Sequence, residues 1–467
     1  MITMSKTMVS YGTTRHDIIV IGAGAGGMMA AGRAAEMGAA VLVLEKMNCP
    51  GKKMLISGKM RCNVTNARDM DDFIAMYGAN GRFLYRAFSR FFRDELLKLL
   101  KRYGVATQQE EDGRIFPASN NAQDVVEALR CFMADHGVQV HADTRATGIQ
   151  IAQGRVTGVM TDQGIIPAPA VILATGGASY PGTGSTGDGY RMAKVMGHTI
   201  VKLRPSLVPF VVSESKLARS MQGVSLRQVR LTAYHGKAEE LTQSLMPTTD
   251  YGRGTGQERP PHPIIESRLG DMVLTHFGIS GPIVLQMSLA IVDALEKGPV
   301  SVAVDLKPDI PEKQLHQMVQ QKFDGHGKRS YRRILSDLLP QNMVEPFLEM
   351  TGIPPDRLAS QISLEERRRL ISLLKSFRFN IKKPLSVASA MVTAGGVSLK
   401  EIDPRTMASK LVQGLYFCGE VMDIDADTGG YNLTASFSTG YVAGESAAAY
   451  TKSRIQNPKS QTNSKFK

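Results

Sequence analysis

The feature that most constrains this chain is a glycine-rich turn between two short apolar runs near its beginning. Gly22, Gly24 and Gly27 follow the run Ile18–Ile21, and an alanine-rich stretch leads to a second run at 41–44. Apolar runs of this length are typical of buried parallel strands, and the glycine spacing is that of a strand-turn-helix unit. We therefore predict an α/β fold that begins with a strand, a glycine turn, a helix and a second parallel strand.

Each glycine of this turn has a physical role in binding a dinucleotide. Gly22 allows the tight turn, Gly24 lets a pyrophosphate approach the backbone, and Gly27 lets the helix pack closely on the strand. The helix N-terminus offers unpaired N–H groups to the phosphates. Glu45, 18 residues after Gly27, is placed to accept hydrogen bonds from ribose hydroxyls. Because a 2′-phosphate would meet this anion, the pattern favours FAD or NAD.

Composition places the chain among ordinary globular proteins. Its 467 residues are enough for two or three domains, and 43% are hydrophobic and 21% charged. The sequence has no run of 18 apolar residues and no signal-peptide pattern, so we expect no membrane span and a cytoplasmic protein. Four scattered cysteines without a Cys-x-x-Cys pair predict reduced thiols, no zinc site, and no dithiol-disulfide reductase of the usual kind.

The net charge of +13 raises the question of nucleic acid. Part of the excess lies in the segment 451–467, which has no acid, and Arg82, Arg86 and Arg90 repeat every four residues along one predicted helix face. That face is either solvated or a surface for phosphate groups. We find no aromatic platforms interleaved with these arginines, and the chain has no tryptophan, so nucleic acid is not the expected partner.

The sequence pattern changes along the chain and predicts a discontinuous domain organisation. The dinucleotide domain is expected at 16–201 and 386–450, with a β-meander built from 138–140, 148–151, 156–161 and 171–174. A β-rich inserted domain is expected at 202–310 and a helical one at 311–385, where Ser363 and Glu366 form a capping box. Residues 1–15 and 451–467 read as a disordered leader and a disordered basic tail.

Three further segments are rich in glycine and small polar residues: 51–66, 174–190 and 414–433. Each follows a predicted strand, where open α/β sheets bind their ligands. Residues 182–187 repeat the G-x-G-x-x-G spacing, but no strand immediately precedes them and no acid follows about twenty residues later, so a dedicated NAD(P)H domain is not expected. Asp423, Asp425 and Asp427 resemble a calcium loop, but Thr428 and Thr434 stand where that loop needs Gly and Glu.

The predicted cofactor-binding residues are therefore drawn from four segments. They are Gly22, Ala23, Gly24, Ala25, Gly26, Gly27, Glu45, Lys46, Lys52, Lys53, Ser57, Gly58, Arg61, Cys62, Asn63, Thr65, Ala174, Thr175, Gly176, Gly177, Gly419, Glu420, Asp423, Gly429, Gly430, Tyr431, Asn432 and Leu433. No metal site is predicted.

The order of these motifs carries a family resemblance. The sequence from about residue 16 to 448, including Thr-His-Phe-Gly-Ile-Ser-Gly-Pro at 275–282 and Ala-Gly-Gly-Val at 394–397, is similar to the BaiN-like family of NAD(P)/FAD-dependent oxidoreductases, also labelled the aminoacetone oxidase family. The resemblance implies a Rossmann-type, three-layer FAD-binding domain interrupted by a β-barrel-like and a small helical subdomain, with non-covalent FAD. This chain departs from the family pattern at Lys59-Met60 and Asp425-Ala426-Asp427.

The expected activity is that of an FAD-dependent oxidoreductase acting on a small organic substrate by hydride transfer at flavin N5. We favour a reductase linked to NAD(P)H as a transient donor. The alternatives left open are an O₂-dependent amine or ketone oxidase, an RNA-acting flavoprotein and a flavin-binding protein without turnover. His276 and Tyr431 are the candidate proton-exchanging residues. His276 is at least as well explained as a structural residue, and Tyr431 as a cofactor contact.

Overall fold

The computed structural model describes residues 16–241, 246–257 and 259–456. The chain divides into two compact units: unit 1 contains residues 1–204 and 392–467, and unit 2 contains residues 205–391. These two boundaries lie three and six residues beyond the ones predicted from the sequence, after residue 201 and before residue 386. The predicted leader, and residues 457–467 of the predicted tail, lie outside the described residues.

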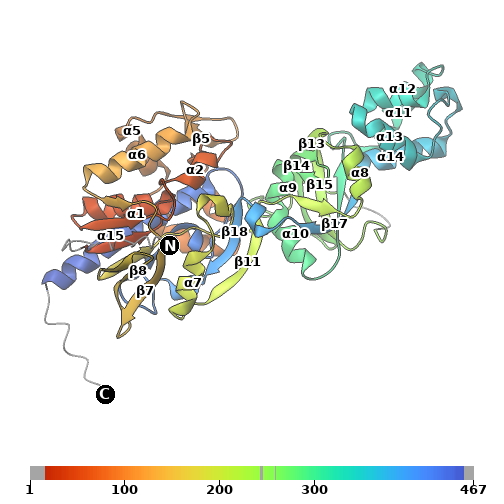
Figure 1. Ribbon diagram of the computed structural model, residues 1–467. Coiled ribbons are helices and arrows are strands. Elements are labelled where there is room, and N and C mark those ends of the chain that lie inside the picture. The colour runs from red at the N-terminus through yellow and green to blue at the C-terminus, as the bar shows by residue number, and fades with distance from the viewer. Residues whose placement is uncertain (1–15, 242–245, 258, 457–467) are drawn as a thin grey trace, which may run out of the picture. The chain divides into compact units, whose positions relative to one another are not determined.

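A five-stranded parallel sheet forms the centre of unit 1 (Figure 1). Every residue of its three middle strands is buried, which explains their continuous apolar sequences. In spatial order the strands are β19 (Leu415–Phe417), β10 (Ala170–Leu173), β1 (Ile18–Ile21), β2 (Val41–Leu44) and β6 (Gln139–His141).

The strand order creates a topological switch point at β1. The chain adds β2 and β6 on one side of β1, then returns to add β10 and β19 on the other side. The backbone of Ala174 donates to Ile21 O, and that of Gly22 donates to Leu44 O, so the glycine turn and the segment after β10 leave the sheet side by side. Ligands of open parallel sheets bind at this kind of crevice.

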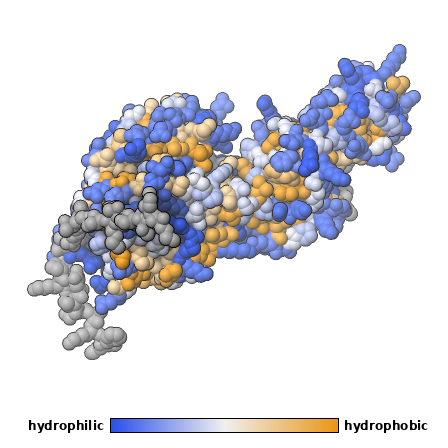
Figure 2. Space-filling model, in the orientation of Figure 1, coloured by the Kyte–Doolittle hydropathy of each residue, from blue (hydrophilic) through white to orange (hydrophobic). Residues whose placement is uncertain are grey.

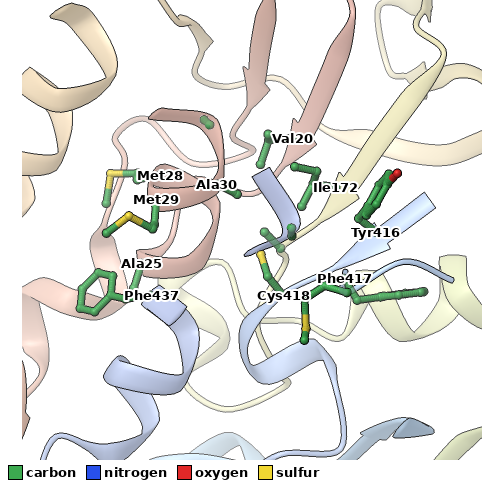
Figure 3. Close-up of a cluster of buried hydrophobic side chains, with 14 of the residues drawn as sticks. Val20, Ala25, Met28, Met29, Ala30, Ile172, Tyr416, Phe417, Cys418 and Phe437 are labelled. Atoms are coloured by element: carbon green, nitrogen blue, oxygen red, sulfur yellow. The ribbon is translucent and has the colours of Figure 1, made fainter. Parts of the chain in front are cut away.

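Two helices made largely of small residues pack closely on one another: α1 (Ala25–Glu36) and α15 (Tyr431–Gln456). A Cβ added to Gly440 would lie 2.3 Å from the Gly26 carbonyl oxygen, and one added to Gly444 would lie 2.3 Å from the Ala30 carbonyl oxygen. Figure 3 shows part of the buried core around α1, in which Met28, Met29 and Ala30 of α1 belong to one cluster with Val20 of β1, Ile172 of β10 and Phe437 of α15. α15 continues past residue 450, the predicted end of the dinucleotide domain, to Gln456, so residues 451–456 of the predicted tail are helical.

Unit 1 contains further helices besides α1 and α15. The helix predicted to carry Arg82, Arg86 and Arg90 is present and ends at Arg90, and the next helix begins at Arg93. The helices are α2 (Lys52–Ile56), α3 (Met70–Ala75), α4 (Gly81–Arg90), α5 (Arg93–Arg102), α6 (Ala122–Asp135) and α7 (Asp188–Val195).

Three smaller sheets complete unit 1. They are β3 (Thr65–Asn66) with β5 (Arg114–Pro117) and β4 (Thr107–Gln109); β7 (Ala146–Ala152) with β8 (Arg155–Thr161) and β9 (Gly164–Pro167); and β11 (Ile200–Ser206) with β18 (Val392–Val397). The predicted meander is present, but two of the four segments assigned to it belong elsewhere. Residues 139–141 and 170–173 belong to the parallel sheet, because their partners are β2 and β1, and residues 164–167 supply the third strand of the meander.

Unit 2 contains a closed six-stranded barrel, as the family resemblance predicted. Alternate residues of its long strands, such as Leu231 and Ala233, join one buried core with Val302 and Val304. Around the barrel the strands are β12 (Phe210–Val212), β15 (Gly278–Ser280), β14 (Ile264–Leu274), β13 (Ser225–His235), β16 (Val300–Asp305) and β17 (Phe377–Pro384).

The helices of unit 2 are α8 (Ser215–Ser220), α9 (Pro282–Gln286), α10 (Ser288–Leu295), α11 (Glu312–Gly325), α12 (Tyr331–Leu338), α13 (Gln341–Thr351) and α14 (Leu364–Lys375). The predicted capping box at the start of α14 is confirmed: Glu366 N donates to Ser363 Oγ at 3.2 Å, and Ser363 N donates to Glu366 Oε2 at 2.9 Å. The visible face over α11 and α12 is largely hydrophilic (Figure 2). Among the described residues, no helix combines the length and apolar character needed to cross a membrane.

Candidate cofactor site

In the glycine turn after β1, two glycines have no room for a side chain and one glycine does. Gly22 has φ +102°, and a Cβ there would lie 2.6 Å from the Ala174 carbonyl oxygen. A Cβ on Gly27 would lie 1.9 Å from the Gly22 carbonyl oxygen. A Cβ on Gly24 would meet nothing within 4 Å. The space is therefore open only where a pyrophosphate has to approach the backbone, which is the arrangement a dinucleotide requires.

Glu45 directly follows β2, and its carboxylate is hydrogen-bonded to the glycine turn. Its Oε2 accepts a hydrogen bond from Ala23 N at 2.8 Å, and its Oε1 accepts one from Met47 N at 2.8 Å. The side chain is largely buried, with 9% of the residue exposed. A carboxylate oxygen has further lone pairs, so Glu45 keeps the capacity to accept ribose hydroxyls beside the turn.

The segment after β2 is docked onto the same turn. Gly51 N donates to Ala23 O at 2.9 Å, which holds the start of α2 beside the glycines. Two residues after Gly51, Lys53 Nζ donates to Ser179 Oγ at 2.6 Å and to Glu420 Oε2 at 2.7 Å. The neighbouring Lys52 is half-buried.

Glu420 gathers a polar cluster that the sequence only partly predicted. Its Oε1 accepts from Thr393 N at 2.8 Å and from Ser179 Oγ at 3.2 Å, and its Oε2 accepts from Lys53. A Cβ on Gly177 would lie 2.7 Å from Glu420 Oε1, so Gly177 is the residue that lets this carboxylate approach the chain after β10. Ser179 stands in the glycine-rich segment 174–190, whereas Thr393 comes from β18 and was not among the predicted site residues.

A left-handed turn follows α2. Gly58, Lys59, Met60 and Cys62 all have φ between +56° and +68°. Cys62 Sγ is fully buried, and burial raises the pKa of this thiol to about 11, partly offset by a hydrogen bond with Ser57. Burial likewise raises the pKa of Cys418 to about 12. Both therefore remain thiols near neutral pH and are unsuited to nucleophilic roles.

Arg61 is held by the neighbouring strand and loop rather than pointing freely into the site. Its Nη2 pairs with Glu110 Oε1 at 2.5 Å, and its Nε donates to Asn120 Oδ1 at 2.8 Å. The guanidinium also lies 3.9 Å from the centre of the Phe116 ring. Its predicted contact with the cofactor stays a prediction.

Asn63 and Thr65 join this loop to the start of α15. With the Asn63 amide oriented to satisfy its neighbours, its nitrogen donates to Ile115 O and Thr65 O, and its oxygen accepts from Gly430 N at 3.0 Å. Thr434 Oγ1 lies 2.9 Å from Thr65 Oγ1. Gly430 has φ +91°, and a Cβ there would lie 2.5 Å from Thr65 O, so this close approach needs glycine.

The segment 419–433 forms the last part of the candidate site. Gly419 N donates to Thr439 Oγ1 at 3.0 Å, and Asn432 holds the preceding loop through Ala426 N at 3.0 Å and Ala426 O at 2.8 Å. Burial raises the pKa of Asp423. The predicted residues Ala25, Gly26, Ala174, Thr175, Gly176, Gly429 and Leu433 lie on these same turns.

Tyr431 is 3% exposed and packs among aromatic side chains. Its ring centre lies 4.7 Å from that of Phe73, and its carbonyl oxygen accepts from Tyr77 Oη at 2.7 Å. Burial raises the pKa of Tyr431, which keeps the phenol protonated. His276 belongs to unit 2, where it is exposed in the turn between β14 and β15. The structure does not bring these two predicted proton-exchanging residues together within one unit.

The predicted Arg82/Arg86/Arg90 stripe is shorter than expected. Arg90 Nη2 pairs with Glu445 Oε2 at 2.7 Å, and all three arginines are exposed. Tyr85, between Arg82 and Arg86 on α4, is 52% exposed, so an aromatic side chain does accompany these arginines, contrary to the expectation from the sequence. Within the described part of the chain, no group of three or more His, Cys, Asp or Glu residues could hold a metal ion.

Taken together, the open position at Gly24, the acid at Glu45 and the glycine-rich turns at the ends of β1, β10 and β19 fit an FAD molecule. This fold and site define a Rossmann-type flavoprotein oxidoreductase. A family model described as the HI0933-like protein Rossmann domain matches residues 16–446. The chain belongs to this family of FAD-dependent oxidoreductases, as the predicted BaiN-like resemblance indicated.

Curated relatives match over almost their whole length. The chain is 30% identical over 437 residues to a 3-dehydro-bile acid delta(4,6)-reductase of Clostridium scindens, covering 93% of this chain and 99% of the relative. It is 29% identical over 440 residues to a ribosomal RNA dihydrouridine synthase of Escherichia coli, covering 93% of this chain and 98% of the relative. A solved 3-ketosteroid-delta4-(5alpha)-dehydrogenase from Rhodococcus jostii is 15% identical with a TM-score of 0.49, covering 95% of this chain and 99% of that one.

Proposed function

We propose that this chain is an FAD-dependent reductase that adds hydrogen across a ring carbon–carbon double bond conjugated to a carbonyl group, with NAD(P)H as the electron donor. The supporting observation is that two differently named relatives share one type of reaction. A delta(4,6)-reductase of a 3-dehydro bile acid and a dihydrouridine synthase both, by name, saturate a ring double bond. Each relative is covered almost completely by this chain, so the proposal concerns the whole protein.

When bound, FAD supplies hydride transfer at N5. The turn at Gly24 would receive its pyrophosphate and Glu45 would accept hydrogen bonds from its ribose. Glu420 and Lys53 form a fixed polar cluster beside Gly177. The 26-residue helix α15 begins at Tyr431, and the positive end of its dipole would stabilise negative charge that develops nearby.

Two substrate classes are consistent with this reaction, and we retain both. The first is a small conjugated ketone, in keeping with the expected small organic substrate. The second is a uridine base in ribosomal RNA, which is favoured by the net charge of +13 and by the exposed Arg82, Tyr85 and Arg86 on α4. We also propose a cytoplasmic location, because Cys49, Cys62, Cys131 and Cys418 are all free.

Anaerobic mixing with NADH or NADPH tests the proposed donor. Rapid bleaching of the flavin absorbance is expected for the reductase. No bleaching by either nucleotide, together with peroxide formation from an amine or ketone in air, would instead identify an oxidase. Tyr431→Phe and His276→Gln should be compared during turnover with substrate over a pH series, because loss of the catalytic acid or base removes its pKa from the pH profile.

A binding titration distinguishes the two substrate classes. If ribosomal RNA is the substrate, binding should weaken steeply as salt is raised and should be reduced by Arg82→Glu/Arg86→Glu. The control is Lys216→Glu/Arg219→Glu on α8, which makes the same change of charge at two exposed residues of unit 2. Equal loss in both variants would indicate a non-specific charge effect and would favour the small-molecule substrate.

A further inference from the structure

Asp188 is the first residue of α7. Its buried carboxylate accepts hydrogen bonds from three cationic side chains and one hydroxyl group. Its Oδ2 accepts from Lys46 Nζ at 2.6 Å and from Thr186 Oγ1 at 2.9 Å. Its Oδ1 accepts from Arg145 Nη2 at 3.0 Å and from Arg191 Nη2. Burial alone would raise the pKa of Asp188, but hydrogen bonds from Lys46, Thr186 and Arg145 lower it to about 2. The carboxylate is therefore charged under all ordinary conditions.

This cluster fastens residues 180–187, which we call the strap, onto the segment that follows Glu45. Lys46 Nζ also donates to Thr186 Oγ1 at 2.6 Å, within the strap. A Cβ on Gly184 would lie 3.0 Å from Met47 Cγ and 3.5 Å from Lys46 Cε, so the strap packs directly on this segment. At the same end, Gly187 N donates to Gly177 O at 3.1 Å. The C-terminal half of the strap is thus held by Lys46 and Gly177, beside the predicted ribose position.

The repeated G-x-G-x-x-G spacing at 182–187 has a physical explanation in this arrangement. Gly184 has φ +102° and Gly187 has φ +75°, both in the left-handed region that glycine adopts without strain. These glycines let the strap turn sharply between Gly177 and α7. The turn therefore explains the repeated spacing without a second nucleotide site.

We propose that the strap closes over the adenosine end of the cofactor site and that the Asp188–Lys46 pair fastens it, which slows the release of FAD. This inference rests on FAD binding alone, so it is independent of which substrate is reduced. The Lys46 and Asp188 side chains are 21% and 8% exposed, whereas those of Arg145 and Arg191 are 55% and 62% exposed. The inner pair should carry most of the effect, because exposed ion pairs are weakened by water and salt.

The rate of FAD release from the purified holoprotein tests this proposal. After dilution, free flavin is separated by rapid ultrafiltration at a series of times. Asp188→Asn and Lys46→Met should each release FAD at least about tenfold faster, because removing one partner of a buried ion pair acts mainly on dissociation. In the double variant, the fold-increase in the rate of FAD release should be smaller than the product of the two single fold-increases, because both changes remove the same pair.

The matched control is Asp71→Asn on α3, an exposed residue, which should release FAD within about twofold of the wild-type rate. The proposal is overturned if folded Asp188→Asn and Lys46→Met proteins release FAD at the wild-type rate, or if their effects multiply independently. Should Asp188→Asn fail to fold, Lys46→Met alone provides the test, because it removes the same pair and leaves Asp188 with Arg145, Arg191 and Thr186. Release of FAD from folded Lys46→Met at the wild-type rate would equally refute the proposal.

Discussion

Gly24→Ala should separate cofactor binding from folding. Gly24 has an extended backbone with φ −80°, which alanine also adopts, and its added methyl group would meet no atom within 4 Å. The apo-protein should therefore lose less than about 1 kcal/mol of unfolding free energy, since the change affects only the N-cap of α1. The same methyl group would occupy the space through which the pyrophosphate reaches the backbone N–H groups.

The effect on FAD binding can be estimated from the hydrogen bonds that this displacement removes. Hydrogen bonds to a charged group contribute about 1.5–3 kcal/mol each, and losing one or two of them amounts to about 3 kcal/mol. The expected result is about a 100-fold weaker Kd for FAD. Gly27→Ala is the contrasting variant, because its Cβ would lie 1.9 Å from the carbonyl oxygen of Gly22. The helix and the strand would have to separate, so we expect this variant to lose about 3 kcal/mol or more of unfolding free energy.

The assay combines a titration of apo-protein with FAD, followed by flavin absorbance, with urea unfolding of the same preparations. The reasoning predicts that Gly24→Ala unfolds like the wild type but binds FAD weakly, and that Gly27→Ala is impaired in both measurements. A Gly24→Ala protein that retains stoichiometric FAD with an unchanged Kd would show that the pyrophosphate does not lie at this turn.

Three further predictions concern stability. Gly440→Ala should lower the unfolding free energy by about 1–3 kcal/mol, because its Cβ would lie 2.3 Å from the Gly26 carbonyl oxygen; an unchanged urea midpoint would contradict the close packing of α1 on α15. Glu420→Gln should cost about 2–3 kcal/mol, because it leaves the charge of Lys53 without its partner, and equal stability in urea would argue against that pair. The pKa of Asp188, about 2, lies below its ordinary value of 3.8, so its stabilising contribution is complete above about pH 4 and is lost as the pH falls toward 2. Unfolding free energies measured across this interval should fall more steeply for the wild type than for Asp188→Asn, and parallel curves would refute the assignment.

The sequence predicted the parts of the site that depend on local chemistry. The turn at Gly22–Gly27 follows from strand, glycine and helix preferences over a few residues, and the capping box at Ser363 and Glu366 from a four-residue pattern. Both are found in the structure. The segments 51–66 and 414–433 were also recognisable, because each combines glycine with a preceding apolar strand.

What depends on pairing between distant segments could not be predicted in the same way. Residues 139–141 and 170–173 have ordinary strand patterns, and nothing in them reveals that their partners are β2 and β1 and not the neighbouring meander. The contact between Thr393 and Glu420 joins two separate segments, as does the pairing of Lys46 with Asp188. Tyr85 was missed because exposure on a short helix depends on which face packs against α15, which a four-residue periodicity does not determine.

The most direct test of the proposed reaction is the oxidative half-reaction. The holoprotein is reduced with light under anaerobic conditions, then mixed separately with a conjugated cyclic ketone and with ribosomal RNA that lacks dihydrouridine. The proposal predicts that one of these substrates restores the oxidised flavin spectrum, with one saturated double bond formed per flavin. If neither substrate reoxidises the flavin, while an amine or ketone in air yields peroxide, the protein is an oxidase and the proposed reductase activity is wrong.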